Sequence, residues 1–274
     1  MILKKLFLFV LTCAFLAPTN VFADKGKWSL TPYFGVNAAT SREMVESKTS
    51  IAGAATFSDG SSFDGTLSIS TRKLDFDDTH NAPILTGFDI GYFLTKDLEV
   101  FGGFQSVTAG GNKVGAIDVA AAGTFTNSGG TATAIALGDT AEAEFDNYNS
   151  WAIKVGATKY LPMGDYIPYV GGYLGLKHVD KMDITLTLST VGAGSLKTKF
   201  YDSTNIGFFG FHTGVYRDFT TGSIPLLVGV RTRLDYTPEL IGNDVDTELV
   251  GLDVSNDVGG GMDFGLTAHV LLTF

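Results

Sequence analysis

The sequence predicts an all-β protein, a transmembrane antiparallel up-and-down β-barrel of about eight strands with long extracellular loops and short periplasmic turns. Three observations predict this fold. Apolar residues recur at every second position through most of the chain, and helical periodicity is hard to find. Short and long connections between the predicted strands alternate. The composition is 45% hydrophobic, yet beyond the N-terminal segment no apolar stretch approaches the length of a membrane-spanning helix.

The first 23 residues are expected to be a cleaved signal peptide. A short basic region precedes an apolar run from Leu6 to Ala17, and Val21-Phe22-Ala23 places small residues where a signal peptidase cuts. The apolar run is shorter than the roughly 20 residues of a membrane-spanning helix. Residues 24–274 would then form the barrel domain. The only cysteine, Cys13, lies in the signal peptide, so the mature chain would contain no disulfide.

The segment 258–274 shows the alternation most clearly. Every second residue from Met262 to Phe274 is apolar, whereas the positions between them are mostly polar or small. The segment 224–236 repeats the pattern and carries three charged residues on its other face. A soluble β-sandwich would bury the apolar face, whereas a membrane barrel turns it to lipid and points the charges into the lumen. This segment alone is compatible with both.

The connections favour the barrel. Three pairs of segments are joined by short turns at 95–97, 162–165 and 220–223, whereas the other connections cover roughly 40–82, 109–147, 180–203 and 237–256. Membrane barrels alternate in this way. The predicted strands are therefore 27–39, 83–94, 98–108, 148–161, 166–179, 204–218, 224–236 and 258–274. Parts of the long loops, including 183–188, are expected to continue as β-hairpins.

The alternation also places charged residues of both signs on inward faces, namely Asp89, Glu99, Asp235, Asp263, Lys154, Lys177, Arg231 and Arg233. The interior of an eight-stranded barrel is just wide enough to be filled by side chains. We therefore expect a network of ion pairs in a plugged lumen, because unpaired buried charges are costly. The alternative is a charged lining of a narrow channel. His212 and His269 also face inward and are expected to be hydrogen-bonded fillers.

Two acidic clusters lie in the long loops. They comprise Asp75, Asp77, Asp78 and His80, and Asp244, Asp246, Glu248, Asp253 and Asp257. Oxygen-rich loops can bind Ca²⁺, but neither cluster has the spaced pattern with its glycine. Solvated acidic loops are therefore expected, and we predict no catalytic, cofactor-binding or metal site. With 29 acidic and 19 basic residues, the chain is also poorly suited to bind nucleic acid.

The residues from Leu266 to Phe274 resemble the terminal strand of Gram-negative outer-membrane proteins. In those proteins a final Phe with alternating apolar residues is read by the barrel-assembly machinery. Together with the signal peptide and the strand rhythm, the chain resembles the small barrels of the OmpA transmembrane-domain, OmpX, OmpW, opacity and surface-antigen type. The resemblance implies secretion to the periplasm, insertion into the bacterial outer membrane, contact with its lipid and lipopolysaccharide, and Phe274 as an assembly signal.

The function expected from these features is that of a surface protein with a structural or interaction role, similar to an adhesin or surface antigen. Its long external loops would contact host or neighbouring-cell surface molecules. A narrow porin or transporter for small or hydrophobic solutes is the alternative. A lipid-modifying barrel enzyme is third, because no serine motif lies near either His212 or His269 in the sequence. We therefore expect no enzymatic activity and no cofactor.

Overall fold

A computed structural model describes residues 25–45, 49–52, 55–56, 60, 62–187, 195–219, 226–238 and 260–274. The expected signal peptide and the acidic cluster between 244 and 257 lie outside the described residues. None of the described helices is long and apolar enough to cross a membrane.

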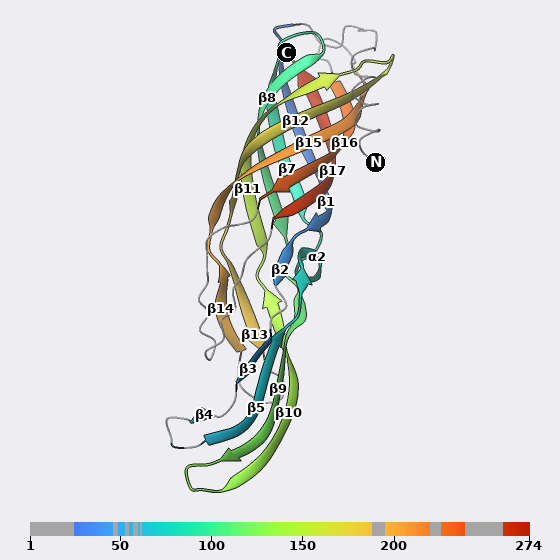
Figure 1. The fold of residues 1–274 in the computed structure, drawn as a ribbon. Helices are drawn as coiled ribbons and strands as arrows, with labels where there is room; N and C mark the ends of the chain where they lie inside the picture. The colour runs from blue at the N-terminus through green and yellow to red at the C-terminus, as the bar shows by residue number, and fades with distance from the viewer. Residues whose placement is uncertain are drawn as a thin grey trace, which may run out of the picture.

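Eight strands close into a single antiparallel barrel (Figure 1). They are β1 (Trp28–Ser41), β7 (Ile84–Phe93), β8 (Leu98–Ala109), β11 (Tyr148–Tyr160), β12 (Tyr166–Val179), β15 (Thr204–Asp218), β16 (Leu226–Thr237) and β17 (Gly261–Thr273). Each pairs with its neighbours in the order β1-β17-β16-β15-β12-β11-β8-β7, and β7 pairs with β1 again. The predicted fold class is confirmed, and every strand boundary lies within three residues of its prediction.

The pairing of the first and last barrel strands closes the sheet. β1 and β17 run antiparallel from the pair Ser29↔Thr273 to the pair Ser41↔Met262, with one irregularity between Asn37 and Ala39. Beyond the last pair, Trp28 and Phe274 exchange two backbone hydrogen bonds of 3.0 Å each. Closure leaves the barrel without an edge strand, so the backbone groups of its wall are paired within the sheet.

The long connections form a second sheet that extends beyond one end of the barrel (Figure 1). It contains β3 (Thr49–Ala52), β4 (Ala55–Thr56), β5 (Ser62–Thr71), β9 (Lys113–Thr126), β10 (Ala132–Phe145), β13 (Met182–Thr187) and β14 (Ser195–Tyr201). We call this sheet the extension. The expected hairpin continuation at 183–188 corresponds to β13, and the 109–147 connection is the β9–β10 hairpin.

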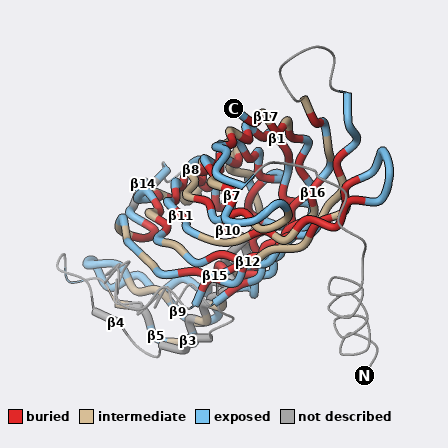
Figure 2. The backbone as a smooth tube through the Cα atoms, turned by 90° about the horizontal axis from the view of Figure 1, so that it is seen from above, coloured by how far each residue is buried: buried red, intermediate tan, exposed pale blue. Residues whose placement is uncertain are grey.

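Buried and exposed residues alternate along the barrel strands, most regularly on β17, and both classes lie in the barrel wall (Figure 2). On β17, Asp263 is 6% exposed, whereas the next residue, Phe264, is 43% exposed. Among the side chains that the structure describes, all exposed large hydrophobic ones lie on the barrel strands, their short turns or Phe274. The barrel therefore has an apolar exterior and a polar interior, the reverse of a soluble protein.

Inward-facing glycines make room for the large side chains of the interior. A Cβ atom at Gly103 would collide with the carboxylate of Asp89, and one at Gly214 would collide with the ring of Tyr169. Glycine at these positions therefore lets a charged or aromatic side chain from the neighbouring strand cross the lumen. A different constraint applies in the turn between β11 and β12, where Gly164 has a φ of +64° that favours glycine.

The exposed apolar face can be tested with one charge. Val230 lies near the middle of β16, and its side chain is 53% exposed on the outside of the wall. Val230→Arg is expected to destabilise the barrel by roughly 2–4 kcal/mol in a bilayer, because a cation on a lipid face near the midplane loses its hydration. Urea unfolding in lipid vesicles measures this change. Thr133→Arg, at an exposed position of the extension, is the control and should be neutral. Equal stability of the two variants would contradict a lipid-facing wall.

Candidate functional site

The eight charged residues that the alternation assigned to the lumen are all buried inside the barrel. The most exposed of them is Arg231 at 7%. They come from six of the eight strands; β16 contributes three of them, and each of the other five strands contributes one. The structure arranges most of them into groups of ion pairs, and Tyr173 contacts two of these groups.

The central group contains one carboxylate and two cations. Asp89 on β7 lies 3.0 Å from the Nζ of Lys154 and 2.9 Å from the Nη1 of Arg231. The Lys154 Nζ also lies 4.9 Å from the ring centroids of both Tyr33 and Tyr173. The faces of these rings carry negative potential, so they compensate part of the excess positive charge.

A second group surrounds Arg233 on β16. Its guanidinium lies 3.1 Å from Asp235 and donates hydrogen bonds to Gln105 and Asn37, the latter at 2.7 Å. Asp235 also accepts a hydrogen bond from the hydroxyl of Tyr173. Gln105, Asn37 and Tyr173 were not among the predicted lumenal residues, which were charged residues and histidines. Their inward positions in the alternation were a usable signal.

Glu99 differs from the expected ion-pair network. It accepts hydrogen bonds from the hydroxyls of Ser29 and Tyr160 and forms no ion pair with any residue that the structure describes. Glu99 lies near the start of β8, at the turn end of the barrel. The equal numbers of acids and bases predicted a basic partner for Glu99. In the structure two hydroxyl donors take the place of that base.

The two inward histidines each contact a hydroxyl group. The Nε2 atom of His212 lies 3.0 Å from Thr158 Oγ1, and that of His269 lies 3.0 Å from the hydroxyl of Tyr169. Neither ring hydrogen-bonds to a carboxylate among the described residues, which a catalytic nucleophile–base–acid arrangement would use. The geometry of both rings is that of hydrogen-bonded filling residues.

Apolar clusters close the lumen at both ends. At the turn end the cluster consists of Phe93, Tyr160, Ile167, Tyr169, Tyr216, Leu227 and Leu271. At the opposite end a larger cluster joins the barrel to the base of the extension, and it includes Met44, Leu74, Phe76, Phe145, Tyr148, Met182 and Tyr201. Side chains therefore fill the described interior at both ends, as the narrow lumen of an eight-stranded barrel allows.

The seal next to the extension is built around a short loop structure that we call the cap. It consists of β2 (Glu43–Val45), β6 (Leu74–Asp75) and α2 (Phe76–Thr79), with β2 and β6 paired to each other. The carboxylate of Asp78 accepts a hydrogen bond of 3.0 Å from the backbone N–H of Asp75, which starts the helix. Part of the first acidic cluster therefore has a helix-capping role, and its three acids are exposed as expected. No described group of acids, histidines or cysteines is placed to hold a metal ion.

His80 is not part of a solvated loop, contrary to the expectation for this cluster, because its side chain is only 2% exposed. Its ring stacks on Phe76 with 4.6 Å between the centroids. Nδ1 lies 2.9 Å from Thr79 Oγ1, and Nε2 lies 3.2 Å from the backbone oxygen of Asp146. Burial lowers the pKa of His80 to about 4. The histidine is therefore a neutral part of the cap at neutral pH.

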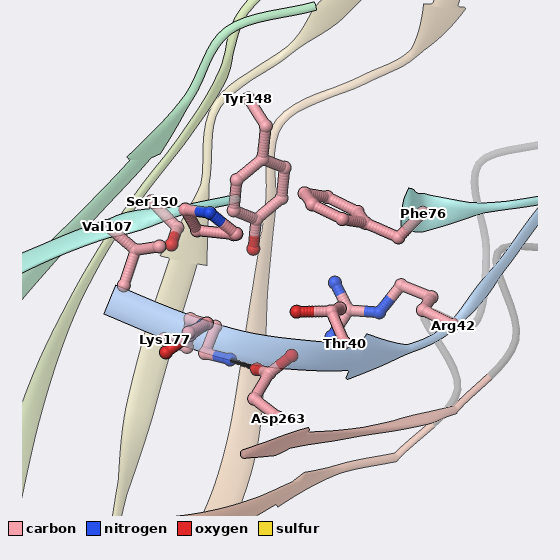
Figure 3. A pocket seen from close by; sticks show the side chains of 10 residues that line it. Thr40, Arg42, Phe76, Val107, Tyr148, Ser150, Lys177 and Asp263 are labelled. Carbon is pink, nitrogen blue, oxygen red and sulfur yellow. Dashed lines mark hydrogen bonds and ion pairs between the residues drawn. The ribbon is translucent and has the colours of Figure 1, made fainter. Parts of the chain in front are cut away.

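Below the cap, a small cavity lies between the seal and the lumenal charges (Figure 3). Thr40, Arg42 and Tyr148 line it on the cap side, and the ion pair between Lys177 and Asp263, at 3.2 Å, lines it on the lumenal side. Arg42 follows directly after β1 and is only 3% exposed. Arg42 falls in a predicted long loop and was not among the predicted lumenal residues, because its burial depends on the cap.

The closed eight-stranded sheet with an apolar exterior has the architecture of small outer-membrane barrels. No family model matches the chain, and no curated protein matches its sequence. Solved structures match in fold: Neisserial surface protein A is 14% identical with a TM-score of 0.36, covering 91% of this chain and 98% of that one.

Two further structures match over similar lengths. Ail, the attachment invasion locus protein of Yersinia pestis in complex with the heparin analogue sucrose octasulfate, is 12% identical with a TM-score of 0.33, covering 90% of this chain and 99% of that one. The outer membrane protein OprG from Pseudomonas aeruginosa is 10% identical with a TM-score of 0.37, covering 92% and 97%. At these values the likeness concerns the barrel architecture alone.

The central charge group predicts unequal effects of removing its members. Asp89→Asn leaves Lys154 and Arg231 buried without their carboxylate, and it should cost roughly 3–5 kcal/mol. Arg231→Met should cost clearly less, because Asp89 keeps Lys154 as a partner at 3.0 Å. Urea unfolding in lipid vesicles measures both changes. A larger loss of stability for Arg231→Met than for Asp89→Asn would contradict the arrangement of one carboxylate between two cations.

The cap is expected to lose stability in acid because of His80. Its pKa in the folded cap is about 4, below the ordinary value of 6.5. An unfolded cap therefore takes up a proton as the pH falls below about 6.5, whereas the folded cap does not until the pH reaches about 4. Cap stability is complete above that window and declines through it.

Thermal unfolding of the cap, followed by near-ultraviolet circular dichroism at about pH 7.5 and about pH 4.5, measures this decline. His80→Phe keeps a ring on Phe76 but cannot titrate, so it should reduce the difference between the two pH values. His178→Phe is the control, because His178 lies on the barrel wall away from the cap and stacks on Trp151. An unchanged pH dependence in His80→Phe would exclude His80 as its source.

Proposed function

We propose that this chain is a surface protein of the bacterial outer membrane, in which a sealed barrel anchors the extension outside the cell. The observation that supports this most strongly is the distribution of side chains in the barrel wall. Large apolar side chains cover its outside, and the charged ones are paired inside. Such a surface is stable in hydrocarbon and would aggregate in water.

The orientation follows from the unequal ends of the barrel. The turns between β7 and β8 and between β11 and β12 span only a few residues, whereas the opposite end continues into the extension. Membrane barrels place short turns in the periplasm and long loops outside. We therefore assign the extension to the extracellular side, where it is the part of the chain that can contact lipopolysaccharide or molecules of host and neighbouring cells.

The sealed interior favours an interaction role over transport. A porin needs a continuous aqueous path, and a transporter of apolar solutes needs an open cavity, whereas ion pairs and aromatic clusters fill this lumen. Conductance in planar bilayers separates the two functions, since steady currents would favour the porin alternative. We also propose that the chain is not an enzyme, because both lumenal histidines are buried inside the barrel and each contacts a hydroxyl and no carboxylate among the described residues. A lipid-product assay tests this point.

The proposed topology predicts opposite accessibility of two epitope tags. A tag between Ser128 and Gly129, at the tip of the β9–β10 hairpin, should bind antibody on intact cells. A tag between Met163 and Gly164, in the turn between β11 and β12, should bind only after the outer membrane is permeabilised. Both insertion sites lie outside the regular strand pairing of the barrel, so both tagged chains should fold. Equal labelling of the two tags on intact cells would refute the proposed orientation.

A further inference from the structure

Among the described residues, the lysines and arginines of the barrel strands have acid partners, with one exception. The eight strands carry six of these cations, and five of them form ion pairs. Four of the five are the lumenal cations described above. The fifth, Lys159, lies on the outside of the wall and pairs with Asp97. The exception is Arg217 on β15, which is exposed, and no hydrogen bond or ion pair joins its guanidinium to another described residue.

Arg217 lies on the outside of the wall, at the turn end of the barrel. The outward positions before it on β15 are Phe209, Phe211, Thr213 and Val215. Three of these four are apolar, so the cation occupies the point at which the apolar stripe of the strand ends. Its neighbours across the sheet are Tyr166, the first residue of β12, and Val228 of β16. Both neighbours are exposed large side chains of the outer wall. Arg217 therefore lies at the boundary between the lipid-facing surface and the water on the turn side.

Two aromatic rings hold the guanidinium at this boundary. Its central carbon lies 5.9 Å from the ring centroid of Tyr166 and 5.3 Å from that of Phe219. The two rings are themselves 53% and 47% exposed. A guanidinium over an aromatic face is attracted by the negative potential of that face. Its N–H groups point away along the plane of the cation, so they stay free to donate to an oxygen ligand.

No described acid of the chain supplies this ligand. Asp165 and Asp218 belong to the same end of the barrel, where the backbone N–H of Asp218 donates to the backbone oxygen of Asp165 at 3.2 Å. Neither carboxylate forms an ion pair with Arg217. The next six residues, 220–225, include no acid in the sequence. At the edge of a lipid-facing wall, the anions within reach are the phosphates of lipid headgroups.

We propose that Arg217, held between Tyr166 and Phe219, binds the phosphate of a glycerophospholipid in the periplasmic leaflet of the outer membrane. The guanidinium presents parallel N–H groups that match two oxygens of a phosphate. The acyl chains of the same lipid lie against the apolar wall that begins at Val228, whose side chain is 40% exposed. The choice of leaflet rests on the proposed orientation of the barrel, whereas the phosphate chemistry of the site does not.

Native mass spectrometry of the full folded chain tests this site. The chain is refolded in a maltoside detergent, which contains no phosphate, and phosphatidylglycerol is titrated into the micelles. One molecule of this lipid should stay bound at concentrations at which any others are lost. Diacylglycerol, which has the acyl chains without the phosphate, should not be retained. Excess inorganic phosphate should leave the lipid in place, because it makes no contact with the apolar wall. Its complete displacement by inorganic phosphate would mean that the site takes a free anion and not a lipid.

Three variants separate the site from a general attraction between cations and anionic lipid. Arg217→Gln should weaken the binding of phosphatidylglycerol by about tenfold, because it removes a charge-assisted hydrogen bond to phosphate. Arg217→Lys keeps the charge and loses the planar fork, so it should restore only part of the binding. Lys159→Gln is the matched control, because Lys159 is the other outward cation of the barrel strands and already pairs with Asp97. It should bind the lipid like the unmodified chain. All three substitutions lie on the outer wall, and heat-modifiable gel mobility verifies that each variant folds.

Equal retention of phosphatidylglycerol by the unmodified chain and by Arg217→Gln would overturn the proposal. This result is independent of the two epitope tags, because binding in micelles does not depend on orientation. Tags exposed as predicted, together with equal retention, would refute the lipid site alone. Tags exposed in the reverse order, together with a loss of binding in Arg217→Gln, would support the phosphate site and overturn its assignment to the periplasmic leaflet.

Discussion

The structure depends on one constraint, the pairing of every backbone N–H and C=O group in the wall of the barrel. Hydrocarbon offers no hydrogen bonds, so a spanning sheet cannot have an open edge. Here β1 and β17, the first and last barrel strands, satisfy this requirement by pairing along their length, and the backbone bonds between Trp28 and Phe274 complete the seam. Once the sheet is closed, alternate side chains must point to lipid or into a narrow interior, and this division determines the remaining features of the molecule.

The narrow interior explains the polar groups of the lumen. Glycines on neighbouring strands make room for some of these side chains, as at Gly103 beside Asp89 and Gly214 beside Tyr169. A buried charge is tolerated only with a partner, and the partners here include rings and hydroxyls as well as opposite charges. Arg42 follows the same rule, because Tyr148 hydrogen-bonds to it and the carboxylate of Asp263 lines the same cavity.

The molecule has two structural parts, the closed barrel and the extension. Two apolar clusters lie at the ends of the lumen, and the polar network between them pairs the buried charges of the wall. The cap joins the two parts, because Phe76, Tyr148 and His80 pack together between the barrel strands and the base of the extension. Acid acting on His80 would therefore loosen the cap and change how firmly the extension is held without unfolding the barrel.

The sequence by itself determined the barrel strands, their inward and outward faces and the inward position of the eight lumenal charges. This was possible because a period of two is a local property that a strand keeps whatever its neighbours are. Only the tertiary structure decided which groups meet. Arg233 donates to Asn37, 196 residues away, and Glu99 binds hydroxyls instead of a base. The tertiary structure also decided that His80 and Arg42 are buried. Both lie in predicted loops, and a loop residue is buried by distant segments that fold over it. The alternation within a strand carries no information about such contacts.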